Sequence, residues 1–135
     1  MTEKSYELFR SASRDEIVKT IKEELDRRNE SPIWLEKVVP FADAILSILI
    51  PLRDENRLFD PQGEKIDELT PELFFQWSDF VSLKSLYFRV KDVDLETLAE
   101  YLHRYSVNLE DERLDFPIAN YNLHLGVSNV IKSLL

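Results

Sequence analysis

Apolar side chains recur at helical spacing along most of this chain. Between Ser13 and Arg28, isoleucine and leucine recur every four residues from Ile17 to Leu25 and form a single stripe. Ser13 and Glu16 form a capping box, in which a hydroxyl and a carboxylate three residues later satisfy free amides at a helix start. The pattern therefore predicts a half-exposed helix over this stretch.

The most apolar stretch lies between Phe41 and Leu52, where nearly every side chain is hydrophobic. A helix that is hydrophobic all round is buried, so we expect a central helix at about residues 41–54. Ser31-Pro32 starts a short helical segment before it. Pro40 then either kinks that helix or begins a new one, because proline has no backbone N–H to donate.

Further helices are predicted toward the C-terminus. Thr70-Pro71 caps and starts one that runs past Trp77, and Asp94 caps a second. Residues 82–91 fit either a short strand or a helix, and we favour a helix because no partner strand is evident. Pro117 starts the final helix. Its apolar stripe is Ile118, Tyr121, Leu125 and Ser128, broadened by Val127, Val130 and Ile131.

We predict an all-α fold, a compact orthogonal bundle of about six helices around the buried helix at about 41–54. The 135 residues fit one domain, 1–135, and are enough to bury a hydrophobic core. The chain has no cysteine, so disulfides do not contribute to its stability. The apolar run around Phe41 is too short and too interrupted to insert into a membrane. The final helix is still apolar at Leu134-Leu135, so we interpret the chain as a domain excised from a longer protein.

The chain is strongly acidic, with 26 acidic and 17 basic residues and a net charge of −9. Residues 54–79 and 92–115 each carry eight acidic and two basic side chains, so most of the excess lies in the middle and later loops. Binding to nucleic-acid phosphates depends on Lys and Arg, so this charge disfavours DNA as a partner without excluding it. It favours basic proteins instead.

Residue patterns that carry catalysis are missing from the sequence. Gly63 and Gly126 are the only glycines, and neither lies in a phosphate-binding loop or a dinucleotide fingerprint. His103 and His124 lack metal-ligand spacing, and we interpret both as surface or half-buried helix residues. We therefore expect no catalytic residues, no metal, no cofactor and no enzymatic activity.

Two features have competing interpretations. Asp43 interrupts the apolar helix, and a buried charge is costly unless it is paired. We favour an Asp43 that faces outward or bonds a neighbouring helix cap, over a buried pair with Arg53 or another cation. The other feature is a group of aromatic residues, which we assign to core packing because a base-stacking platform needs a basic groove. They are Trp34, Phe74, Phe75, Trp77, Phe80, Tyr87 and Phe88.

Several segments, in their order, resemble the all-α domain of type IV secretion coupling ATPases, the hexameric motors of conjugation-like channels. They are Trp34-Leu35-Glu36-Lys37, Leu52-Arg53-Asp54, Leu69-Thr70-Pro71-Glu72-Leu73, Val81-Ser82-Leu83 and Tyr121 to Ile131. The likeness covers about residues 15–135. The chain departs from the family pattern at Val39-Pro40 and at Pro51, which leaves the helix limits open.

The resemblance implies a domain that recognises substrates or adaptors in the cytoplasm, within a hexameric, membrane-anchored ATPase that takes part in DNA transfer. Its Walker motifs would lie outside this chain. The implied partners are relaxases, secreted effectors or adaptor proteins. For their basic surfaces we select four acidic residues as the candidate contact: Glu110, Asp111, Glu112 and Asp115.

Two other functions remain open. A small acidic inhibitor or immunity protein, which covers a basic active site, fits the size and charge but not the apolar end of the final helix. A helical DNA-binding module would suit the DNA traffic of the family but not the net charge of −9.

Overall fold

The computed structural model describes residues 3–29, 31–110 and 117–134. Within these ranges the chain is all-helical, and the one extended pairing is an isolated antiparallel bridge between Phe59 and Lys65. The prediction of an all-α bundle is therefore confirmed. The helices are, in chain order, α1 (Glu3–Ser11), α2 (Arg14–Arg27), α3 (Pro32–Asp54), α4 (Pro71–Gln76), α5 (Phe80–Arg89), α6 (Glu96–Arg104) and α7 (Ile118–Leu134).

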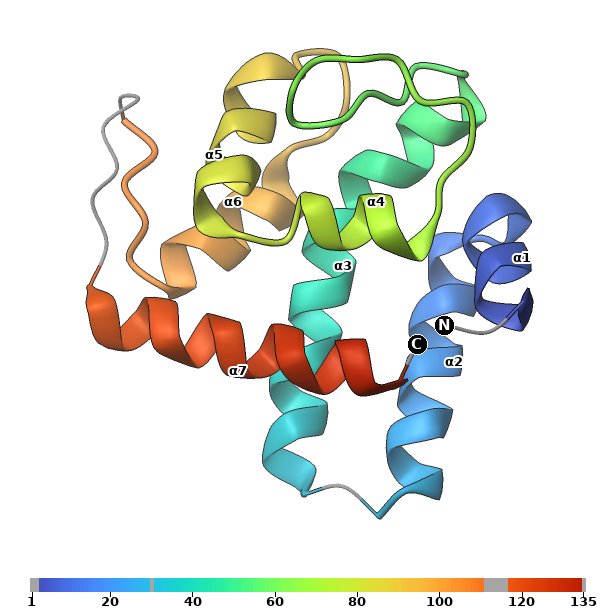
Figure 1. Ribbon diagram of the computed structural model, residues 1–135. Coiled ribbons are helices and arrows are strands. Elements are labelled where there is room, and N and C mark those ends of the chain that lie inside the picture. Colours follow the sequence, from blue (N-terminus) through green and yellow to red (C-terminus); the bar gives the residue numbers. More distant parts are fainter. Residues whose placement is uncertain (1–2, 30, 111–116, 135) are drawn as a thin grey trace.

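Helix α3 is the central element of the bundle. It contacts α2, α4, α6 and α7, and α7 crosses it on one side (Figure 1). Ten of its twelve side chains from Phe41 to Leu52 are buried, and the other two, Asp43 and Pro51, are half-buried. The buried central helix is thus present, but it begins at Pro32 rather than near residue 41.

Pro40 and Pro51 both lie inside α3, and neither starts a new helix. A proline inside a helix cannot donate a hydrogen bond to the carbonyl four residues before it. Pro40 therefore leaves the carbonyl of Glu36 without its helical partner. Glu36 is exposed, so water can satisfy that carbonyl, while the burial of Val38 and Phe41 on either side holds the helix together. Packing therefore overrides the local preference of proline here.

Predicted side-chain caps mark the starts of two helices. The Ser13 hydroxyl accepts from the Glu16 amide at 3.2 Å and starts α2, and the Thr70 hydroxyl accepts from the Leu73 amide at 3.2 Å and starts α4. Asp94, predicted to cap the next helix, is not the N-cap of α6: that position is Leu95, and the Asp94 carboxylate accepts from the Glu96 amide at 2.9 Å from one residue further out. Such caps satisfy amides that have no partner within the helix.

The helix predicted to run from Thr70 past Trp77 is divided into α4 and α5. The division occurs at Asp79, whose carboxylate accepts from the Ser82 amide at 2.8 Å and caps the new helix. Trp77 lies at the end of α4 and donates its indole N–H to the Phe59 carbonyl at 3.1 Å. Residues 82–91 lie mostly in α5, so the helical interpretation of that stretch is correct.

Helix α1 was not predicted, because its sequence is polar apart from Leu8 and Phe9. Phe9 is fully buried, and its ring lies 5.4 Å from that of Phe74. Arg53 donates to the carbonyls of Phe9 and Ala12 at 3.0 and 2.7 Å, which satisfies acceptors at the C-terminal end of α1. One aromatic anchor and one arginine therefore attach this helix to α3.

Three of the seven aromatic residues assigned to core packing lie in the centre of the bundle, and Trp34, Phe75 and Tyr87 pack against it from outside. Phe74, Trp77 and Phe80 are fully buried. The other four aromatic residues of that group, Trp34, Phe75, Tyr87 and Phe88, are half-buried.

Within the described ranges, none of the helices combines the length and hydrophobicity that a membrane span requires.

Candidate functional site

The predicted partner contact falls mainly on residues that the structure does not describe. Glu110 is exposed on the segment after α6, and its amide donates to the side chain of Asn108 at 2.9 Å. Asp111, Glu112 and Asp115 lie outside the described residues. The assignment of these four residues therefore stays a prediction.

A second acidic surface lies at the C-terminal end of α3, on the loop of residues 55–70 (Figure 1). Glu64, Asp67 and Glu68 are exposed there, and within the described ranges none of their carboxylates forms an ion pair. We call these three residues the loop carboxylates. They are free to attract a basic partner, although nothing in the sequence had distinguished them from other acidic residues.

The loop that carries them is held by a turn and by an ion pair. Gly63 donates its amide to the Asp60 carbonyl at 2.8 Å and has φ +90°, a left-handed conformation that favours glycine. Arg57 lies 2.8 Å from Asp92, which joins the loop to the segment before α6. The hydrogen bond from Arg57 lowers the pKa of Asp92, so this carboxylate stays charged in mildly acidic solution.

Arg89 of α5 fixes the other side of the loop. Its guanidinium lies 4.7 Å from the ring centre of Phe59 and 5.8 Å from that of Trp77, within the range of cation–π attraction. It also donates to the Pro61 carbonyl at 3.1 Å. The loop is thus a built part of the fold, and the loop carboxylates are displayed from a fixed support.

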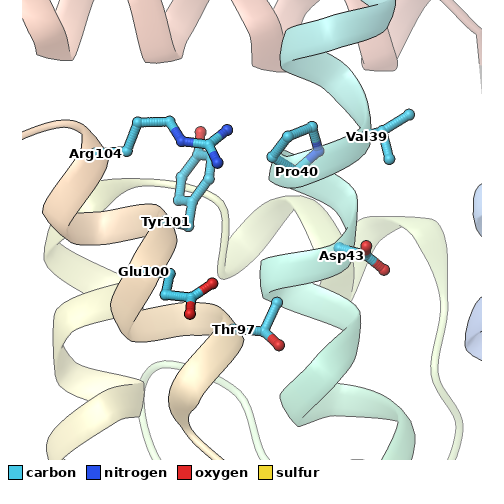
Figure 2. Close-up of a pocket in the computed structure, with 7 residues that line it drawn as sticks. All are labelled: Val39, Pro40, Asp43, Thr97, Glu100, Tyr101 and Arg104. Carbon is cyan, nitrogen blue, oxygen red and sulfur yellow. The ribbon is translucent and has the colours of Figure 1, made fainter.

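A depression of about 200 Å³ lies between α3 and α6 (Figure 2). Its charged groups are the carboxylates of Asp43 and Glu100 and the guanidinium of Arg104, which suits contact with polar or charged groups. It is lined by Val39, Pro40, Asp43, Thr97, Glu100, Tyr101 and Arg104.

Asp43, at the edge of this depression, bonds Arg14 at 3.1 Å, and Arg14 is the first residue of α2. Asp43 is therefore paired with a cation, as in the alternative interpretation, but the cation is not Arg53, which pairs with Asp54. The Asp43 side chain is 31% exposed, so the pair is not buried, and in this respect the favoured interpretation holds.

His124 of α7 is fully buried, which overturns the prediction of a surface or half-buried residue; His103 is exposed as predicted. The His124 Nδ1 lies 2.7 Å from the Tyr101 hydroxyl, and its Nε2 bonds the Ser78 carbonyl. A carbonyl can only accept, so Nε2 carries the hydrogen and Nδ1 accepts from Tyr101. The ring also stacks on Phe80, with 4.2 Å between the ring centres.

Burial determines the protonation of this pair. It lowers the pKa of His124 to about 4, against which the bond to Ser78 and the charge of Asp79 act weakly, and it raises the pKa of Tyr101. Both side chains are therefore neutral at pH 7. The pair joins α6 and α7 to the α4–α5 turn, and no solvent reaches His124, so it serves the fold.

The buried stripe of α7 also differs from the predicted one. Its buried side chains are His124, Val127, Ser128 and Ile131, whereas Ile118 and Leu125 are 76% and 38% exposed. The helix is thus rotated relative to the prediction, because His124 occupies the inward position that hydrophobicity alone had assigned to Leu125.

No group of three or more histidine or carboxylate side chains that could hold a metal ion occurs in the part of the chain that the structure describes. Comparisons with protein-family models, with curated proteins and with solved structures found no match to this chain. The site must therefore be interpreted from the chain's own residues.

Proposed function

We propose that this chain is a protein-recognition domain for basic partners, and that it is the substrate- or adaptor-recognition domain of a type IV secretion coupling ATPase. The observation that carries the proposal is the contact between Trp34 and Gly126, since a Cβ atom at Gly126 would lie 3.5 Å from the Trp34 ring. These residues belong to the first and the last of the segments that resemble that family. The first and the last of these segments thus lie against each other in the fold.

Other residues of the same segments support the proposal by the contacts that they make. Arg53, from Leu52-Arg53-Asp54, bonds the end of α1, and Thr70 caps α4. Leu83, from Val81-Ser82-Leu83, is fully buried in the core. These three residues thus have structural tasks that their side-chain types explain.

Charge supports a basic protein as the partner. The chain carries a net charge of −9, and like-signed phosphates would be repelled by it. Basic surfaces of relaxases, effectors or adaptors would be attracted over a Debye length of about 8 Å at physiological salt. Complementary charge of this kind accelerates encounter and selects among partners.

The proposal is tested by pull-down assays with the relaxase, effector and adaptor proteins encoded in the same genome. One variant neutralises the predicted contact, and a control variant makes the same change of four charges at the loop carboxylates and Asp94. The test variant is Glu110→Gln, Asp111→Asn, Glu112→Gln, Asp115→Asn, and the control is Glu64→Gln, Asp67→Asn, Glu68→Gln, Asp94→Asn.

We expect the wild-type chain to retain at least one of these proteins, and the test variant to lose it while the control keeps it. Loss of binding in the control alone would move the contact to the loop and reject the four predicted residues. A wild-type chain that retains none of these proteins at low salt would reject the proposed function itself.

A further inference from the structure

The depression between α3 and α6 presents two opposite charges to the solvent. Glu100 and Arg104 are exposed residues of α6, four positions apart, and both side chains point across the gap toward α3 (Figure 2). A carboxylate and a guanidinium at this spacing can pair with each other, but within the described ranges neither of the two forms an ion pair. We call Glu100 and Arg104 the two poles of the depression, and both are open to a ligand.

The third charge of the depression is already compensated. Asp43 bonds Arg14 of α2 at 3.1 Å, and its carboxylate is turned away from α6 (Figure 2). The two carboxylates and the two guanidinium groups therefore balance, although the chain as a whole carries a net charge of −9. Such a site disfavours a ligand of a single sign, because a lone cation would face Arg104 and a lone anion would face Glu100.

The rest of the lining gives the two poles a fixed and partly apolar support. Val39 and Pro40 are half-buried residues of α3 and contribute hydrocarbon surface. Tyr101 lies between the poles in sequence and is 2% exposed, and its hydroxyl is bonded to His124 of α7 at 2.7 Å, which holds α6 in place. A short hydrocarbon chain can lie on such a surface while its charged ends remain in contact with water.

The dimensions of the depression determine the size of its ligand. Its volume is about 200 Å³, below the range of about 300–1,000 Å³ that is typical of sites for drug-sized molecules. At about 30 Å³ for each water molecule, it holds about seven, so a ligand of about seven non-hydrogen atoms would fill it. The poles are separated by four residues of helix, which corresponds to about 6 Å along its axis.

We propose that this depression binds a small zwitterion of the ω-amino acid class, with its ammonium group at Glu100 and its carboxylate at Arg104. γ-Aminobutyrate is a suitable probe, because its ammonium nitrogen lies about 5–6 Å from its carboxylate when the chain is extended. In an α-amino acid the two charges are only about 3 Å apart, which is too close to reach both poles. Ion pairs at exposed positions are weak, so we expect a dissociation constant on the order of 1 mM.

NMR titration of the isotope-labelled full chain with γ-aminobutyrate, up to about 20 mM, tests the proposal. Butyrate and butylammonium are the matched ligands, since each keeps the hydrocarbon chain and lacks one of the charges. Glu100→Gln and Arg104→Gln each remove one pole, and Glu96→Gln and Lys91→Gln make the same changes at exposed positions outside the depression. A swap variant carries Glu100→Arg together with Arg104→Glu.

We expect γ-aminobutyrate to cause saturable shifts of the amide signals around Val39 and Tyr101, and each single-charge analogue to bind at least about fivefold more weakly. Each pole variant should weaken binding by about the same factor, and the two controls should not. The swap variant should keep binding, because the ligand can reverse its direction, and this result would separate charge pairing from a disturbed fold.

Three results would overturn the proposal: no saturable shift up to about 20 mM, equal binding of butyrate or butylammonium, or loss of binding in the swap variant. The titration needs no protein partner. The zwitterion site and the proposed recognition of basic proteins can therefore fail independently.

Discussion

Acidification should unfold this protein through His124, and the structure allows the effect to be worked out. The side chain is buried and neutral, with a pKa lowered from 6.5 to about 4. The unfolded chain has the ordinary value of 6.5, so between pH 6.5 and pH 4 it binds a proton that the folded chain does not. The contribution of His124 to stability is therefore complete above pH 6.5 and is lost as the pH falls through this window.

The magnitude follows from the difference between the two pKa values. Each unit corresponds to about 1.4 kcal/mol, so the full effect is about 3 kcal/mol. Between pH 7 and pH 4.5 most of the window is crossed, and we expect a loss of about 2–3 kcal/mol. In a domain of ordinary stability, 5–15 kcal/mol or so, this is a large part of the total.

The assay is urea denaturation followed by circular dichroism at several pH values, for the wild type and for His124→Gln. Glutamine can donate to the Ser78 carbonyl and accept from Tyr101, but it does not titrate. All other ionisable groups are the same in the two proteins, so their contributions cancel in the difference between the two curves. If the free energies of unfolding of the wild type and of His124→Gln change by the same amount between pH 7 and pH 4.5, the reasoning about His124 is refuted.

Two further perturbations test the packing and the attachment of α1. Leu49→Ala removes a fully buried side chain of α3 and should lower the free energy of unfolding by about 2–5 kcal/mol. Val81→Ala, at an exposed position, is the control and should change it by less than about 1 kcal/mol. Urea titration measures both, and equal losses would contradict the burial of Leu49 in the centre of the bundle. Arg53→Ala leaves the carbonyls of Phe9 and Ala12 without their donor, at a cost of about 2–3 kcal/mol, and should accelerate amide hydrogen exchange in α1. The control is Arg57→Ala, which removes exposed ion pairs worth less than about 1 kcal/mol, and unchanged exchange in α1 would show that Arg53 does not hold this helix.

The elements that could be predicted from the sequence are those with strong local signals. Ser13 and Thr70 announce the starts of α2 and α4, and the apolar run after Phe41 identifies the centre of the bundle. Each signal lies within a few residues of the structure that it specifies. Local signals of this kind need no knowledge of the rest of the chain.

The elements that were missed depend on partners far away in the sequence. Helix α1 is attached by Phe9 and by Arg53, which no local pattern connects. The orientation of α7 depends on Tyr101 and the Ser78 carbonyl, which together make a buried histidine tolerable. A hydrophobicity pattern treats His124 as polar and turns it outward, and this error places Ile118 and Leu125 on the buried side, whereas Val127, Ser128 and Ile131 are buried as predicted.

The candidate partner contact was also predicted without knowledge of contacts between distant residues. Sequence reasoning selected Glu110 and the three acidic residues near it because acidic side chains would attract a basic partner. The loop carboxylates are spread over residues 64–68 and are displayed together by the turn at Gly63 and the contacts of Arg89. The number of acidic residues in a segment does not show that the turn at Gly63 and the contacts of Arg89 hold these three side chains in place.

The two tryptophans lie near opposite ends of α3 and give each end its own optical reporter. Trp34 packs on Gly126 and senses the docking of α7, while Trp77 bonds the Phe59 carbonyl and senses the loop. Replacing either one by phenylalanine would leave a single emission signal for the other end. Whether the two signals then change at the same denaturant concentration would reveal if this bundle melts as one cooperative unit or from one end.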